Sequence, residues 1–164
     1  MTRQFTASGL TFSRHILAWG LMYFAAQAGA ADVLVQGSNL HRDARDAAQK
    51  HLPIMLFFTR SACPYCERAR REYLGPMARD PATAQRVVLR EIAIESSLID
   101  LDGRRVAARE FALVYNVRLF PSVILIDGSG RLLADPLVGY TVPDFYGAYL
   151  EARVAAATGK LEHR

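Results

Sequence analysis

Cysteine is scarce in this sequence, since only Cys63 and Cys66 occur among 164 residues. An exported domain that depends on disulfides for its stability usually carries more cysteines at wider spacing. A chain of this length can bury a hydrophobic core without such cross-links. A structural zinc site needs four ligands, and the sequence offers no second cysteine pair. The scarcity of cysteine therefore excludes a disulfide-stapled scaffold and a four-cysteine zinc site, and it favours a chemical role for the pair.

Histidines are also few, and the net charge is small. The four histidines show no spacing typical of metal ligands, and they are His15, His41, His51 and His163. A haem attachment site needs a histidine directly after the second cysteine, where this sequence has Glu67. No methionine or histidine accompanies the cysteines to complete a copper site. The formal net charge is only +4, and the arginines are scattered among acidic residues, so nothing indicates nucleic-acid binding.

The first thirty residues differ in composition from the rest of the chain. They contain two arginines and no acidic residue, and they include an apolar run over residues 16–26. The small residues that follow supply an A-x-A pattern, which fits cleavage after Ala28 or Ala30. These features predict a cleaved secretory signal peptide over residues 1–30 and a mature domain over residues 31–164. An uncleaved anchor is the alternative, but a membrane-spanning helix needs about 20 apolar residues and the run is shorter.

Three apolar segments have the length and composition of buried strands, and they are residues 54–58, 87–94 and 122–126. The turn signal Asp-Gly-Ser-Gly at 127–130 predicts a hairpin whose return strand lies within residues 131–140. Strand–helix–strand order predicts a parallel pair, and the hairpin adds antiparallel strands. The pattern therefore predicts an α/β fold with a mixed sheet.

Helical segments are expected between these strands, at residues 32–51, 67–79, 105–115 and 143–158. The inner face of the 105–115 helix is assigned to Val106, Phe111 and Val114. The apolar stripe of the last helix is assigned to Phe145, Tyr149 and Leu150. Four aromatic side chains are expected in the core, and they are Phe57, Phe58, Phe111 and Tyr115.

The two cysteines lie where a buried strand meets a helix. Pro64 fits the first helical turn, where its missing N–H costs nothing, so Cys63 stands at the helix start. The helix dipole and the unpaired N–H groups there lower a cysteine pKa from about 8.5 to between about 3.5 and 7.5. Cys66 follows one turn later and is placed to attack a mixed disulfide. This context favours a redox pair with Cys63 as the nucleophile, and a structural disulfide or a soft-metal carrier are the alternatives.

Four segments together resemble the thioredoxin superfamily, namely residues 58–66, Phe120-Pro121-Ser122, the turn at 127–128 and Gly139-Tyr140. The likeness covers about residues 53–153. Within the superfamily, the sequence is similar to exported bacterial thioredoxin-like proteins, including the type linked to sulfur oxidation. It implies a thioredoxin-like three-layer fold, with a central mixed sheet of about four strands flanked by helices.

The resemblance also implies roles for the residues around the cysteines. Pro121 is expected to be cis and to lie beside the pair. The backbone of Phe120 is expected to pair with an incoming peptide, as an added strand. Pro64 and Tyr65 lie between the cysteines, and Tyr65 either faces a partner protein or covers the helix.

The chain also departs from its relatives. Thioredoxins carry a buried acid six residues before the first cysteine, where this chain has Phe57, so proton transfer to Cys66 must use another group or water. Ala62 stands where thioredoxins place tryptophan. The inner pair Pro-Tyr is similar to that of glutaredoxins, but the residues before Pro121 are not their Thr-Val, which argues against glutathione as substrate.

Together these features predict a periplasmic thiol–disulfide oxidoreductase that reduces protein disulfides through Cys63 and Cys66, with no metal and no organic cofactor. The expected partners are substrate proteins with disulfides and a membrane thiol electron donor. A non-enzymatic module for docking or copper handling is an alternative. A disulfide oxidase or isomerase is another, because the direction of electron flow depends on the reduction potential. An isomerase usually also needs a dimerisation domain.

Overall fold

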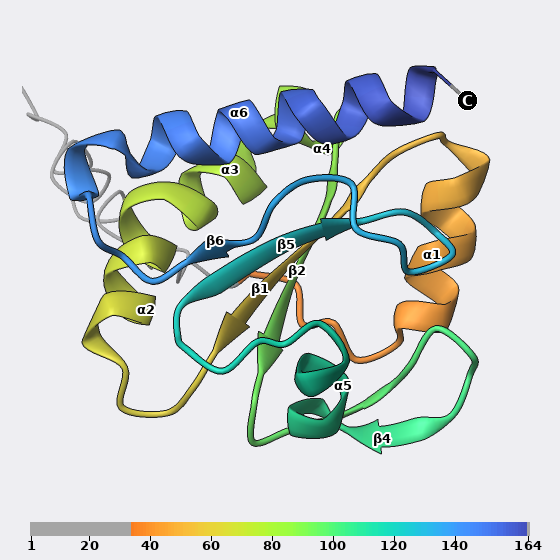
Figure 1. The fold of residues 1–164 in the computed structure, drawn as a ribbon, viewed down its shortest axis with the longest axis horizontal. Helices are drawn as coiled ribbons and strands as arrows, with labels where there is room; N and C mark the ends of the chain where they lie inside the picture. The colour runs from red at the N-terminus through yellow and green to blue at the C-terminus, as the bar shows by residue number, and fades with distance from the viewer. Residues whose placement is uncertain (1–33, 164) are drawn as a thin grey trace, which may run out of the picture. The chain divides into compact units, whose positions relative to one another are not determined.

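The computed structural model describes residues 34–163, so the predicted signal peptide lies outside the described residues. A four-stranded sheet has the order β2-β1-β5-β6 (Figure 1). Its strands are β1 (Ile54–Thr59), β2 (Val88–Ala93), β5 (Ser122–Ile126) and β6 (Leu137–Val138). β1 pairs with β2 in parallel and with β5 antiparallel, and β5 pairs antiparallel with β6. The predicted mixed sheet of four strands is confirmed.

β1 is the central strand because it is apolar on both faces. All six of its residues are buried. Successive side chains of a strand point to opposite faces of the sheet. Met55 and Phe57 accordingly enter one core cluster, and Ile54, Leu56 and Phe58 enter the other. A continuous apolar run, rather than an alternating one, is what a strand covered on both sides requires.

The first helical layer holds the cysteines. α2 (Pro64–Ala69) continues through the π-helical turn η1 (Arg70–Leu74) into α3 (Gly75–Arg79), and α4 (Pro81–Ala84) follows. The long helix α6 (Pro143–Glu162) lies across the sheet beside them (Figure 1). Their buried side chains share one core cluster with Met55 and Phe57 of β1.

The second helical layer covers the opposite face of the sheet. It consists of α1 (Leu40–Gln49), α5 (Ala108–Val114) and the small hairpin of β3 (Ser97–Ile99) and β4 (Arg105–Ala107). Leu40 and Phe111 pack there against the second face of β1. Two helical layers around one sheet confirm the predicted three-layer fold. Within residues 34–163, no helix combines the length and the apolar character needed to cross a bilayer.

The segment 105–115 differs from its prediction, because its first residues are strand β4 and the helix begins only at Ala108. The turn at Gly103, with a φ of 82°, folds β4 back onto β3. Phe111 is buried as expected, but Val114 is 76% exposed, so the inner face assigned to this helix is partly wrong.

The C-terminal half contains two further corrections. The return strand expected within 131–140 consists of only the two residues of β6, with one isolated bridge between Ile126 and Leu132. α6 extends to Glu162, and its buried residues are Tyr146, Leu150, Val154 and Ala157. Phe145 and Tyr149 are instead exposed, because the face that packs on the sheet is rotated from the assigned stripe.

Candidate active site

Cys63 and Cys66 form a disulfide at the start of the first helical layer. Cys63 is the N-cap of α2, and its Sγ accepts a hydrogen bond from the backbone N–H of Cys66 over 3.1 Å. Pro64 occupies the first helical turn, as its fixed φ and missing N–H allow. Cys66 is fully buried, whereas Cys63 keeps 6% of its surface exposed. The two cysteines are therefore inequivalent, and Cys63 is the more accessible one.

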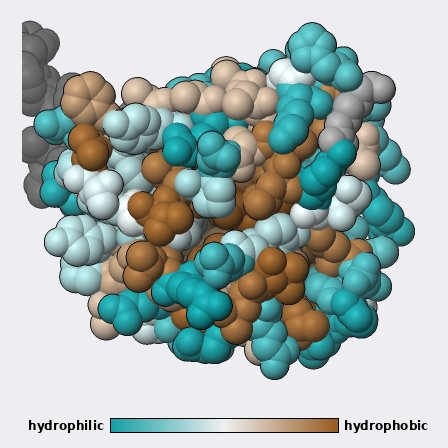
Figure 2. Space-filling view, viewed as in Figure 1, coloured by the Kyte–Doolittle hydropathy of each residue, from teal (hydrophilic) through white to brown (hydrophobic). Residues whose placement is uncertain are grey.

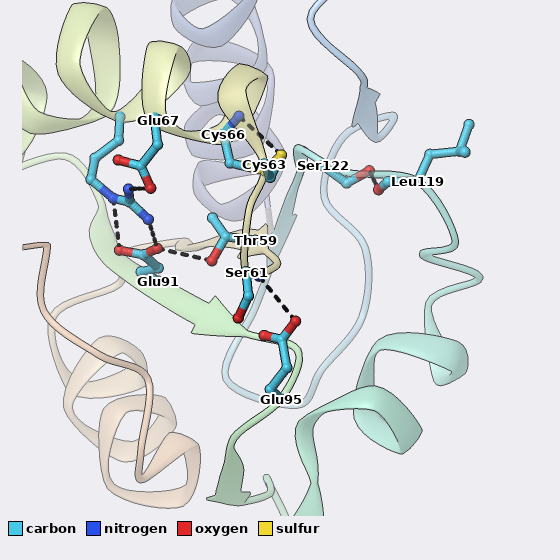
Figure 3. Close-up of a disulfide and its surroundings, with 10 residues drawn as sticks. Thr59, Ser61, Cys63, Cys66, Glu67, Glu91, Glu95, Leu119 and Ser122 are labelled. Atoms are coloured by element: carbon cyan, nitrogen blue, oxygen red, sulfur yellow. Dashed lines mark hydrogen bonds and ion pairs between the residues drawn. A yellow bond between two sulfur atoms is a disulfide. The ribbon is translucent and has the colours of Figure 1, made fainter.

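A second loop approaches the disulfide from β5. The Phe120–Pro121 peptide bond is cis, as predicted. Pro121 is tied to the strand behind it, since its carbonyl accepts from the N–H of Gly139 over 2.7 Å. The Ser122 hydroxyl donates to the carbonyl of Leu119 over 2.8 Å, and Figure 3 shows the two oxygen atoms facing each other. The backbone N–H and C=O of Phe120 have no hydrogen-bond partner within residues 34–163.

The other side of the disulfide is aromatic. Tyr65 is 60% exposed and stacks on Tyr140, with ring centroids 6.4 Å apart. The Tyr140 hydroxyl donates to Glu72 over 2.6 Å, and the guanidinium of Arg68 lies over the Tyr140 ring. The hydrogen bond from Tyr140 is the main cause that lowers the pKa of Glu72. Burial is the main cause that raises the pKa of Tyr140, and the same hydrogen bond is the second cause. Tyr65 thus covers Tyr140 with one side of its ring and presents the remainder to solvent.

A buried carboxylate lies beneath the helix that carries the cysteines. Glu91 of β2 is 4% exposed and pairs in register with Phe57, the position where thioredoxins have an acid. The carboxylate accepts from the Thr59 hydroxyl over 2.9 Å and forms an ion pair with Arg70 (Figure 3). The same ion pair and its hydrogen bond raise the pKa of Arg70, against the opposing effect of burial. Strand β2 therefore places a buried acid beside the β1 position that Phe57 occupies.

Sequence reasoning missed the network around Glu91 and the contact between Glu72 and Tyr140. One signal was present for Glu91, because Arg90 and Glu91 are charged residues within an otherwise apolar strand segment and charged residues are rarely buried without a partner. The Tyr140–Glu72 contact joins residues 68 positions apart and left no local pattern. Within the described part of the chain, no group of three or more histidine, cysteine, aspartate or glutamate side chains gathers in a way that could hold a metal ion.

The architecture and the helix-start cysteine pair together define a thioredoxin-fold protein with a C-x-x-C motif. The model of the thioredoxin-like domain family matches residues 40–153. The chain therefore belongs to the thioredoxin-like domain family. No curated protein matches its sequence.

Solved structures agree with this fold at low identity. A DsbH oxidoreductase is 21% identical, with a TM-score of 0.55, over 83% of this chain and 92% of that one. Thioredoxin from Trypanosoma brucei brucei is 15% identical, with a TM-score of 0.50, over 80% and 96%. The periplasmic thioredoxin SoxS from Paracoccus pantotrophus is 18% identical, with a TM-score of 0.45, over 64% and 98%. The likeness to the first two structures extends to the fold alone.

Proposed function

We propose that this chain is a thiol–disulfide oxidoreductase that reduces disulfides in proteins. The observation that carries the proposal is the position of Cys63, whose Sγ caps a helix and accepts the N–H of Cys66. In the reduced protein the same N–H and the helix dipole stabilise a thiolate at Cys63. The helical segment behind it runs without a break from Pro64 to Arg79.

The reaction consists of two exchange steps. The Cys63 thiolate attacks one sulfur of the substrate disulfide, forms a mixed disulfide and releases the other substrate sulfur as a thiolate. Cys66 then gives its proton to water or to the substrate thiolate already released, and it attacks Cys63 Sγ, which releases the second substrate thiolate and closes the Cys63–Cys66 disulfide. Two electrons pass from the dithiol to the substrate, and a thiol donor must return them before the next cycle. We propose a membrane thiol donor for that step.

Four neighbours position the substrate in this proposal. Pro64 starts the helix so that Cys63 caps it, and the exposed Tyr65 ring contacts the incoming protein. The unpartnered backbone groups of Phe120 pair with an extended segment of the substrate, as in addition of a strand to a sheet edge. Pro121, buried beside them, has no N–H with which to compete for that segment.

The proposed compartment is the periplasm, on the basis of the basic, apolar and small-residue order of residues 1–30. Expression of the full chain in a bacterium tests this point. We expect a periplasmic product whose first residue is Gly29 or Ala31. Recovery of the intact chain from the cytosol would contradict export without affecting the proposed chemistry.

Reduction of insulin by the purified protein, with dithiothreitol as the donor, tests the chemistry. We expect turnover well above that of dithiothreitol alone, none with Cys63→Ser, and a trapped mixed disulfide with Cys66→Ser. Full activity in Cys63→Ser would overturn the assignment of the nucleophile. The reduction potential of the cysteine pair then decides the direction of electron flow. A value of about −270 mV supports a reductase, and a value of about −120 mV supports an oxidase.

A further inference from the structure

A pocket of about 460 Å³ is lined by Ser61, two residues before Cys63, and by Phe120, directly before Pro121. Its walls come from the segment before Cys63, the end of β2, helix α5 and the segment before Pro121. A second pocket of about 200 Å³ shares four lining residues with it and continues over α5. The two form one groove that begins at the catalytic loop and runs toward α5.

Three arginines line this groove, and we name Arg60, Arg109 and Arg118 the arginine pocket. All three are exposed, and none forms an ion pair within residues 34–163. Arg118 donates to the amide oxygen of Asn116 over 2.9 Å, which leaves its charge uncompensated. Seven other arginines of the described chain do pair with carboxylates, namely Arg68, Arg70, Arg71, Arg86, Arg90, Arg104 and Arg131. Three arginines without such a pair therefore lie along one groove.

One carboxylate also lines the groove, but it is already engaged. Glu95 accepts the backbone N–H of Ser61 over 3.0 Å, and Figure 3 shows this contact below the disulfide. That hydrogen bond is the main cause that lowers the pKa of Glu95, and the charge of Arg109 contributes least. A single glutamate set against the arginine pocket leaves the groove positive.

The floor of the groove is apolar. Ile94 and Val117 are buried there, and Phe120 is half-buried. Leu113 and Leu119 stand at the edges with 51% and 64% of their surface exposed. Figure 2 shows hydrophobic and hydrophilic side chains intermingled over this end of the molecule, near α5. The groove therefore suits a peptide segment with both acidic and apolar side chains better than it suits a fully hydrated anion.

We propose that the arginine pocket binds acidic residues next to the target disulfide of a substrate protein, so that this enzyme prefers acidic substrates. The inference rests on the proposed function, since the groove begins at Ser61 and Phe120, on the two loops that present Cys63 and Pro121. An extended segment paired with the backbone of Phe120 passes along this groove. Complementary charge then raises the rate of encounter and fixes the register of binding.

The test compares two synthetic peptides that contain the same disulfide and differ only in three residues beside it, Glu in one and Gln in the other. We expect the purified protein to reduce the Glu peptide with a kcat/KM about tenfold higher at low salt. Added salt should shrink the ratio, because exposed charges are screened. The double variant Arg109→Gln with Arg118→Gln should bring the ratio close to one. Arg45→Gln, an exposed arginine on α1, is the matched control and should keep the preference.

Each outcome of this comparison is distinguishable. Equal rates for both peptides, with insulin still reduced, would overturn the acidic preference and leave the proposed function intact. No reduction of either peptide or of insulin would overturn both. Reduction of glutathione disulfide that depends on Arg109 and Arg118, without a preference between the peptides, would assign the pocket to a small anionic disulfide instead. A preference kept in the double variant would show that other residues carry it.

Discussion

Removal of the Glu91 carboxylate tests whether the buried ion pair beneath the cysteine helix stabilises the fold. Glu91 has 5% of its side chain exposed and accepts hydrogen bonds from Arg70 and Thr59. When one partner of a buried pair is removed, the other charge is left without compensation, which costs about 3–5 kcal/mol. Arg70 keeps 19% of its side chain exposed and a second contact with Glu67, so part of its charge stays solvated. We therefore expect Glu91→Ala to lower the free energy of unfolding by about 3 kcal/mol, at the lower end of that range.

Equilibrium unfolding in urea measures this loss. With an m-value of about 2 kcal/mol/M, the midpoint should fall by about 1.5 M. The matched control is Glu151→Ala. The Arg86 Nη2 and Glu151 Oε2 atoms are 2.8 Å apart, but 44% of the Arg86 side chain and 50% of the Glu151 side chain are exposed. An exposed pair contributes about 1 kcal/mol or less, so the control should stay near the wild type.

A double variant separates the charge from the space that it occupies. Arg70→Met combined with Glu91→Leu replaces both charges with apolar side chains of similar size. It should recover most of the stability lost in Glu91→Ala, because neither charge is left unpaired. Recovery should be incomplete, since the Thr59 hydroxyl loses its acceptor. The reasoning is refuted if Glu91→Ala is as stable as Glu151→Ala, or if the double variant is less stable than the single one.

Three further predictions concern other parts of the fold. The pKa of Glu72 lies below its ordinary 4.5, chiefly because Tyr140 donates to it, so this contact stabilises the fold above that pH and stops doing so as the pH falls through the lowered value. Tyr140→Phe should accordingly be less stable than the wild type at about pH 7 and equal to it at about pH 2, in urea titrations at each pH. Gly130→Ala should lower the free energy of unfolding by about 2 kcal/mol in thermal melts, because φ is 85° and the new Cβ would lie 2.5 Å from a methyl carbon of Leu101. Gly159→Ala is the control, and it should not destabilise the protein because the space around Gly159 is open. Phe58→Ala empties a fully buried position between sheet and α5 and should lower the free energy of unfolding by about 3–5 kcal/mol in urea.

Local sequence signals were enough to predict the parts of the molecule that local physics determines. β1 and β5 are short runs of apolar residues, and a strand buried on both faces has no other pattern to show. The start of α2 is equally local, since Pro64 both permits the first turn and excludes a helix that begins earlier. The cis form of Pro121 came from the resemblance and not from any feature of its neighbours.

Strand β4 and the buried face of α6 were mispredicted because they depend on what packs against them. β4 is three residues long and is held by β3, which is just as short, so neither strand shows a usable period on its own. In α6 the sequence offers apolar residues on more than one side of the helix. Tyr146 and Leu150 are buried, and Tyr149 is exposed, only because the helix meets the sheet at that angle.

The arginine pocket shows the same limit at the scale of the site. Arg60, Arg109 and Arg118 come from three separate segments, and each is an unremarkable exposed arginine when the sequence is read alone. They meet because β1 and β5 are neighbours in the sheet, so the loops that leave and enter these strands open at the same edge. That edge also holds Cys63, since the cysteine follows β1 directly. The sheet order that places Cys63 at this edge therefore also places the three arginines there, and the proposed preference for acidic substrates depends on that order rather than on the C-x-x-C motif.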